Sequence, residues 1–67
     1  MADIGSVIRQ RRKELKLTQD ELAKAVGVAR MTVVRWELGR LPSLKNLKAL
    51  EAALEFPRGT LVMMASL

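Results

Sequence analysis

The side chains best suited to recognition chemistry in this sequence lie between residues 30 and 35. Arginine carries a planar guanidinium that pairs with O6 and N7 of guanine, and an apolar side chain such as valine can pack on a thymine methyl group. Positions i, i+1, i+4 and i+5 share one face of a helix, and here they hold Arg30, Met31, Val34 and Arg35. A helix over this segment would therefore present a basic and partly apolar outer face to a nucleic acid.

The overall charge points to the same kind of partner. The chain has 67 residues and a formal net charge of +5, and a basic balance on a small folded domain favours a polyanion. The alternative for each basic residue is a solvated surface position that keeps the protein soluble. Eight of the twelve basic residues gather in two places, with Arg9, Arg11, Arg12, Lys13 and Lys16 early in the chain and Arg30, Arg35 and Arg40 later.

Two short helices joined by a tight turn are predicted over about residues 18–38. Thr18, with Glu21 three positions later, has the spacing of a capping box, so a helix should begin directly after Thr18. Gly27 should end this helix in a left-handed turn, and a second helix should follow over residues 30–38. This order is the helix-turn-helix pattern, in which the second helix can be held in a DNA groove.

The residues of this motif resemble a known family. LTQDELA, followed by GV, a polar helix and RWELG, is similar to the repressor and Cro group of helix-turn-helix proteins of phages and bacteria, often called the XRE family. The resemblance covers about residues 4 to 61. It implies an all-α fold: a compact four-to-five-helix domain of the phage repressor DNA-binding type with a central helix-turn-helix.

The remaining segments fit one domain over residues 1–67. Helices are expected over 4–15, 44–54 and 60–65, with Asp3 and Ser43 as N-caps of the first two. Apolar residues recur at helical spacing in both of these helices, namely Ile4, Ile8 and Leu15 in the first and Leu44, Leu47, Leu50 and Leu54 in the second.

The resemblance assigns roles to the helix over residues 30–38. In the family, the first two residues of this helix and the one five beyond its start reach base edges, which implies base contacts for Arg30, Met31 and Arg35. Val34 on the same face could pack on a thymine methyl group. The alternative for the two arginines is a phosphate contact or a solvated charge.

Phosphate contacts are expected around the same helix. The family implies that Gln19 bonds a DNA phosphate and braces the start of the second helix of the motif. Backbone amides at a helix N-terminus favour phosphate independently. Such contacts position a protein on DNA without reading its sequence. Further candidates are Thr32, Arg40, Lys45, Arg9 and Arg11.

Arg12 falls on the apolar face of the first predicted helix, where an unpaired charge is costly. The family implies that it forms a partly buried ion pair with Glu37. We therefore expect Arg12 and Glu37 to tie the first helix to the end of the recognition helix, as scaffold rather than readout. Trp36 shares a helix face with Val33 and is expected to anchor the core.

Three features depart from the family pattern. Ala29 stands where a serine or threonine usually caps the recognition helix, which permits fraying. Glu55 stands where a glycine commonly ends the fourth helix. Met31, Val34 and Leu38 make the outer face of the recognition helix unusually apolar, at the i, i+3 and i+7 spacing of a partner-binding stripe.

The end of the chain is densely apolar, with Leu61, Val62, Met63, Met64 and Leu67. A monomer this small can bury Leu61 and one or two of the others. The family implies a two-fold dimer contact within residues 56–67, formed either in solution or on DNA, near Pro57, Arg58, Leu61 and Val62. The alternative is a frayed, adhesive tail.

The composition argues against catalysis and membrane insertion. The sequence has no cysteine and no histidine, so we expect no metal site, no cofactor and no enzymatic activity. No apolar run approaches the roughly 20 residues of a membrane span. A signal-peptide core is also lacking, so we expect no membrane partner and a cytoplasmic location.

The resemblance thus implies a sequence-specific regulator that binds double-stranded DNA. The leading expectation is a repressor that binds a palindromic operator as a homodimer through the major groove. The alternative is an antitoxin or accessory subunit that acts mainly as a protein-interaction module. Its toxin-like partner would bind the apolar stripe of the recognition helix or the C-terminal tail.

Overall fold

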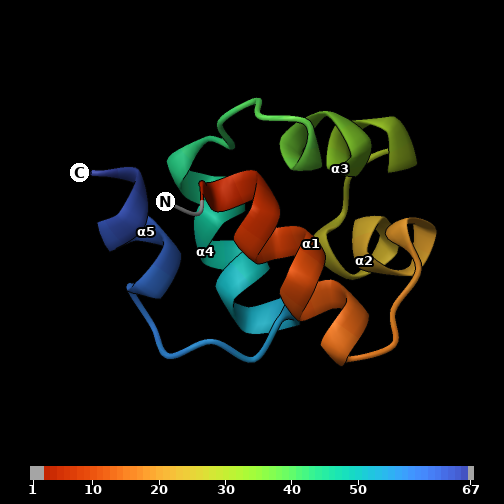
Figure 1. Cartoon of the computed structure of the whole chain (residues 1–67), viewed down its shortest axis with the longest axis horizontal. Coiled ribbons are helices and arrows are strands. Elements are labelled where there is room, and N and C mark those ends of the chain that lie inside the picture. The colour runs from red at the N-terminus through yellow and green to blue at the C-terminus, as the bar shows by residue number, and fades with distance from the viewer. Residues whose placement is uncertain (1–2, 67) are drawn as a thin grey trace.

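Five helices make up the fold (Figure 1). The computed structural model describes residues 3–66, and in that part of the chain the regular elements are all helices: α1 (Ile4–Glu14), α2 (Gln19–Val26), α3 (Arg30–Glu37), α4 (Leu44–Ala53) and α5 (Thr60–Ala65). The predicted all-α fold is confirmed, and α1, α3 and α4 each end one residue earlier than expected. None of these helices is long and apolar enough to cross a membrane.

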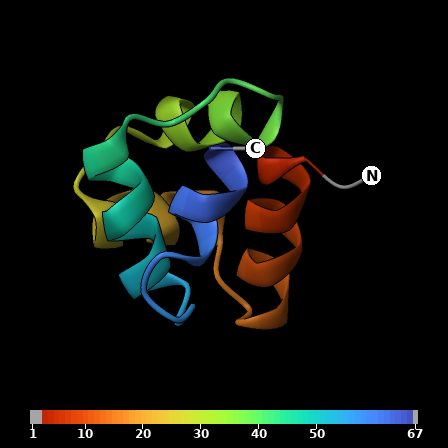
Figure 2. The same ribbon diagram turned by 90° about the vertical axis from the view of Figure 1, so that its left-hand side faces the viewer.

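The helices surround one apolar core, with α3 along one edge of the molecule (Figure 1). In the view of Figure 2, α5 lies between α1 and α4, and α3 lies above them. Trp36 and Val33 are buried, which confirms their predicted place in the core. All five helices contribute to the core, which is formed by Ile8, Leu22, Ala23, Val33, Trp36, Leu47, Leu50, Leu54 and Leu61.

One predicted core position is wrong. Leu44 was expected to continue the apolar stripe of α4, but it is exposed. It is the first residue of α4, and its neighbours Ser43 and Lys45 are exposed as well. The stripe therefore enters the core only one turn later, at Leu47.

Side-chain caps fix the starts of three helices as predicted. Asp3 accepts a hydrogen bond of 2.8 Å from a backbone amide of α1. Thr18 and Glu21 form the complete capping box of α2, with bonds of 2.8 and 3.0 Å between side chain and backbone amide. Ser43 caps α4. α3 has no side-chain cap at Ala29, so its start depends on tertiary packing.

The helices of the motif end in left-handed turns at glycine. Gly27 ends α2 with φ of 89°, as predicted, and Gly39 follows α3 with φ of 118°. At the end of α3, the Gly39 amide donates to the Trp36 carbonyl at 3.1 Å and the Arg40 amide donates to the Arg35 carbonyl at 2.9 Å. This pair of bonds is a Schellman motif, and it fixes the direction in which the chain leaves α3.

The start of α5 depends on a residue from another helix. Glu51 of α4 is only 3% exposed, and its carboxylate accepts hydrogen bonds from the backbone amides of Gly59 at 2.9 Å, Leu61 at 2.8 Å and Val62 at 3.1 Å. The bond from Gly59 is the main cause that lowers the pKa of Glu51, and desolvation opposes it. Glu51 is thus a long-range N-cap that docks α5 on α4, a role that was not predicted from the sequence.

Candidate nucleic-acid interface

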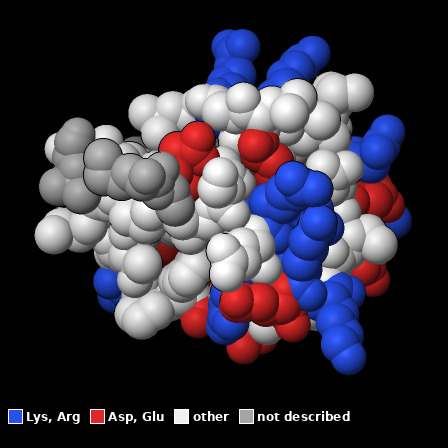
Figure 3. All heavy atoms as spheres, viewed as in Figure 1, with Lys and Arg blue, Asp and Glu red and all other residues white. Residues whose placement is uncertain are grey.

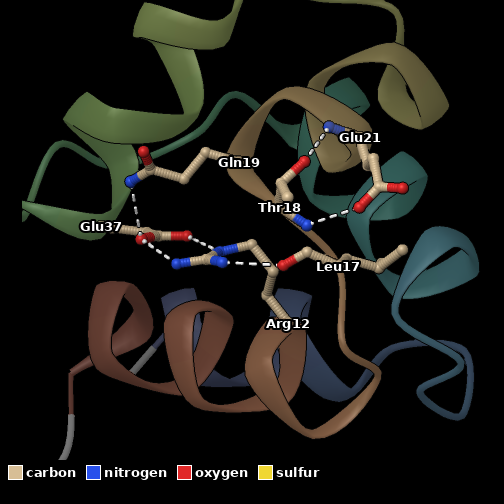
Figure 4. A network of polar contacts seen from close by, with 6 residues as sticks. All are labelled: Arg12, Leu17, Thr18, Gln19, Glu21 and Glu37. Carbon is tan, nitrogen blue, oxygen red and sulfur yellow. Dashed lines mark hydrogen bonds and ion pairs between the residues drawn. The ribbon is translucent and has the colours of Figure 1, made fainter.

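A buried ion pair joins α1 to the end of α3 (Figure 4). Arg12 Nε donates to Glu37 Oε2 at 2.7 Å and Arg12 Nη2 donates to Glu37 Oε1 at 3.2 Å. The third donor, Arg12 Nη1, reaches the Leu17 carbonyl at 2.8 Å. The two charged side chains are only 10% and 4% exposed. The predicted pair is confirmed, and its bidentate geometry satisfies a charge that α1 carries on its inner face.

Gln19 belongs to the same network. Its Nε2 donates to Glu37 Oε1 at 3.2 Å, so the first residue of α2 is held by the last residue of α3 (Figure 4). The expectation that Gln19 braces the start of α3 is therefore wrong. The Gln19 side chain reaches the end of α3 because Glu37 Oε1, which already accepts from Arg12, can accept a second hydrogen bond.

The outer face of α3 is open, as predicted, and mostly basic and apolar. Arg30, Met31 and Arg35 are exposed. Val34 is only half-buried and lines a surface pocket with Gln19 and other residues of α1 to α3, so it lies closer to α2 than the other three residues do. A duplex that meets this face would reach Arg30, Met31 and Arg35 first and Val34 at the margin.

Most of the residues predicted to contact phosphates lie near the outer face of α3, whereas Arg11 lies elsewhere. Arg9 lines the same pocket as Gln19, and Arg40 and Lys45 are exposed on the loop after α3 and at the start of α4. Thr32 is half-buried on α3. In Figure 3, basic side chains project from the edge above α3 and the loop that follows it, and others line the surface over α1. These candidates border the outer face of α3.

Arg11 is engaged elsewhere. Its Nε donates to the Leu54 carbonyl at 2.8 Å, its Nη1 lies 3.2 Å from Glu14 Oε1, and its guanidinium lies 5.7 Å from the ring centroid of Phe56. It covers the C-terminus of α4 rather than the motif. The phosphate contact of Arg11 stays a prediction, but the orientation of α1 turns Arg9 to the motif and Arg11 to α4.

The segment predicted to form a dimer contact has one buried member. Pro57 and Arg58 are exposed and Val62 is half-buried, but Leu61 is 0% exposed in the core. Leu61 therefore has no side-chain surface for a partner, and only the other three residues remain candidates. Of the apolar tail, Met63 is exposed and Met64 half-buried, whereas Leu67 lies outside the described residues.

Two further features of the structure were not predicted from the sequence. Leu41 and Leu44 are exposed, as is Leu38, and in the sequence they alternate with the basic residues Arg40 and Lys45. The exposure of Leu41 could have been predicted, because Leu41 precedes Pro42 in a loop and belongs to no apolar stripe of a helix. The bond from Gln19 to Glu37 had no comparable signal, because Gln19 is uncharged and, unlike Arg12, does not require an anionic partner.

Comparison with known proteins places the chain in a family. The sequence model of a family described as "Helix-turn-helix" matches residues 8–61. The crystal structure of the P22 c2 repressor in complex with a synthetic operator is 39% identical with a TM-score of 0.84, covering 91% of this chain and 94% of that one. The fold of a repressor DNA-binding domain therefore accounts for nearly all of this chain.

Two relatives illustrate the sequence similarity. An uncharacterised HTH-type transcriptional regulator of Methanothermobacter thermautotrophicus is 58% identical over 40 residues, which cover 58% of this chain and 58% of the relative. The HTH-type transcriptional regulator DicA of Escherichia coli is 49% identical over 53 residues, which cover 78% of this chain and 39% of DicA. This chain thus matches less than two thirds of either relative. It belongs to the helix-turn-helix family, and its predicted resemblance to the repressor and Cro (XRE) type is confirmed.

Proposed function

We propose that this protein is a sequence-specific DNA-binding transcriptional regulator of the repressor type. The observation that carries the proposal is the outer face of α3, where Arg30, Met31 and Arg35 are exposed while Trp36 and Val33 anchor the opposite face in the core. Two similarities support the same function. The P22 c2 repressor was solved in complex with a synthetic operator, and DicA is an HTH-type transcriptional regulator. Regulation by occupancy of DNA requires no catalytic group.

The proposed contacts divide between reading and positioning. Arg30 and Arg35 would pair with guanine, and Met31 would contact an apolar base edge such as a thymine methyl group. Val34 contributes at the margin of this face. Gln19, Thr32, Arg9, Arg40 and Lys45 would contact phosphates, which fixes the position of α3 in the major groove without adding sequence information.

The salt dependence of duplex binding tests the positioning contacts. Each phosphate contact by a cation should contribute about 0.9 to the slope of log K against log salt. Arg40→Gln and Lys45→Gln should each lower the slope by about 1. Lys48→Gln, which removes the same charge from the surface near Arg58, should leave it unchanged. Equal effects from all three substitutions would reject the assigned contacts.

A homodimer that reads a palindrome is the second part of the proposal. Pro57, Arg58 and Val62 are accessible beside the start of α5 and are the candidate contact residues. A two-fold dimer would place its two α3 helices in half-sites about 34–36 Å apart. Sedimentation, with and without an operator duplex, tests this. A monomer under both conditions at high protein concentration would reject the dimer.

An antitoxin or accessory subunit remains the second candidate function. The observation that favours it is the exposure of Met31 and Leu38 on the outer face of α3. Binding to a toxin-like protein through apolar contacts would change little with salt, whereas binding driven by phosphates falls steeply. The same salt titration therefore distinguishes the two functions.

A further inference from the structure

Three leucines between α3 and α4 are exposed and have no role in the proposed DNA contacts. Leu38 is the C-cap of α3, Leu41 lies in the loop, and Leu44 opens α4. Their exposed fractions are 82%, 61% and 56%. Exposed apolar patches on a small monomer mark interaction sites, and here three large apolar side chains are exposed within seven consecutive residues. We call these leucines, together with Arg40 and Lys45, the leucine surface.

The leucine surface is presented on an ordered segment. The Schellman bonds from the Gly39 and Arg40 amides fold the start of the loop back onto α3. Pro42 is buried, and Ser43 caps α4. The leucines are therefore held outward by a backbone fixed at both ends. A partner would meet a preformed surface and would not have to order the loop.

The charge of the leucine surface defines the chemistry of its partner. Arg40 and Lys45 lie among the leucines, and Glu37 is the one acidic residue between positions 30 and 45. Its carboxylate already accepts hydrogen bonds from Arg12 and Gln19. Figure 3 shows basic side chains projecting from the edge above α3 and the following loop. DNA phosphates would satisfy the cations but would leave the leucines in water.

We propose that the leucine surface binds an acidic amphipathic helix of another protein. Apolar side chains of that helix would cover Leu38, Leu41 and Leu44, and its flanking carboxylates would pair with Arg40 and Lys45. Because these two cations are also proposed phosphate contacts, the helix and a duplex compete, and the partner releases the regulator from DNA. Only this competition rests on the proposed function.

A second copy of this chain does not fit the leucine surface. A two-fold contact brings the same patch of each copy together, so Arg40 and Lys45 would face their own counterparts. An anionic lipid surface fits less well than a helix, because interfacial binding uses a continuous apolar helix face. Here the leucines come from a helix end, a loop and a helix start. Acidic vesicles nevertheless serve as a comparison in the test.

The test uses the full chain and a synthetic acidic helix of about 20 residues, long enough to be helical, with leucines on one face and glutamates on its flanks. Direct titration without DNA should give saturable one-to-one binding. The double variant Leu38→Ser/Leu41→Ser should bind the peptide about tenfold or more weakly. Met63→Ser, which changes an exposed methionine of α5, should bind it like wild type. Because Leu38 and Leu41 are exposed, the double variant should remain folded.

Two further titrations separate the possible outcomes. A peptide with glutamine in place of glutamate should bind about tenfold or more weakly at low salt, and the acidic peptide should displace a bound duplex from wild type but not from the double variant. Three results would overturn the proposal: no peptide binding, a loss of peptide affinity in Met63→Ser equal to that in the double variant, or binding only to acidic vesicles. If no duplex binds at all, the proposed function fails, while the direct peptide titration still decides this inference.

Discussion

Gly5 of α1 lies against the backbone carbonyl of Trp36 at the end of α3. A Cβ atom on Gly5 would lie 2.5 Å from the Trp36 carbonyl oxygen and 3.0 Å from that of Glu37. Both obstacles are backbone atoms, so no side chain can rotate away. Glycine therefore allows α1 to approach α3 closely enough for Arg12 to reach Glu37.

Gly5→Ala should push α1 away from α3. Overpacking of this kind costs about 1–3 kcal/mol, and in a domain of this size each 1 kcal/mol corresponds to a fall of about 4–8 °C in melting temperature. Gln10→Ala is the matched control, since Gln10 is exposed on the same helix and its side chain should matter little. Equal melting temperatures for the two variants would show that the close approach of α1 to α3 does not contribute to the stability of the fold.

Glu37→Ala should be strongly destabilising. It leaves the Arg12 guanidinium buried without an anion, which costs about 3–5 kcal/mol, and it also removes the acceptor of Gln19. Asp20→Ala breaks the exposed pair with Lys24 at 3.3 Å and should cost less than about 1 kcal/mol. Chemical denaturation of both variants measures the difference, and a wild-type midpoint for Glu37→Ala would contradict the role of the buried pair.

Glu55→Gly should stabilise the protein. Glu55 has φ of 60° after α4, a left-handed conformation that costs a non-glycine residue about 1–2 kcal/mol. Glycine adopts it freely but loses more entropy on folding, so we expect a net gain of about 1 kcal/mol or less. Glu55→Ala removes the carboxylate and keeps the strain, so it should gain nothing. A gain of equal size in both variants would attribute the effect to charge instead.

The cap of α5 should make stability depend on pH. Backbone hydrogen bonds, chiefly from Gly59, lower the pKa of Glu51 from its ordinary value of 4.5. The unfolded chain therefore takes up a proton at higher pH than the folded protein does. The stabilisation is present in full above 4.5 and is lost as the pH falls through the lowered folded-state value.

Melting temperatures of wild type and Glu51→Gln across this acidic range measure the effect. The difference in favour of wild type should be largest near neutral pH and should shrink as the pH falls. The pKa of Asp3 is also lowered, by its bond to Ser6, but this contribution is common to both proteins and cancels in the comparison. A difference that stays constant with pH would show that the carboxylate charge of Glu51 does not hold α5.

The sequence predicted the helix-turn-helix because its determinants are local. The capping box of Thr18 and Glu21 and the glycine turn at Gly27 act within a few residues of where they occur. The partner of Arg12 could also be predicted, because a charge on an inner helix face requires an anion and the family supplies Glu37. These features needed no knowledge of the tertiary structure beyond the order of the helices.

The remaining features depend on how the helices rotate and pack. Arg9 and Arg11 lie about 200° apart around a helix, so they cannot both face the motif. Only the orientation of α1 decides that Arg9 lies at the motif and Arg11 at Leu54. Glu51 becomes a cap only after the chain folds back eight or more residues later. Exposure of Leu44 likewise follows from which helices cover the core, because the apolar pattern of α4 grouped it with Leu47 and Leu50. Burial of Leu61, in contrast, agrees with the expectation from the sequence.

The most direct test of the central claim is selection of binding sites from a random duplex pool at physiological salt, with wild type and Arg35→Ala in parallel. Wild type should enrich a palindrome with half-sites about 34–36 Å apart. Arg35→Ala should lose preference at one base pair of each half-site and bind the wild-type sequence about 1–3 kcal/mol more weakly. Folded wild-type protein that enriches no sequence would contradict the proposed function, and an unchanged preference for Arg35→Ala would contradict the assignment of the outer face of α3 as the reading surface.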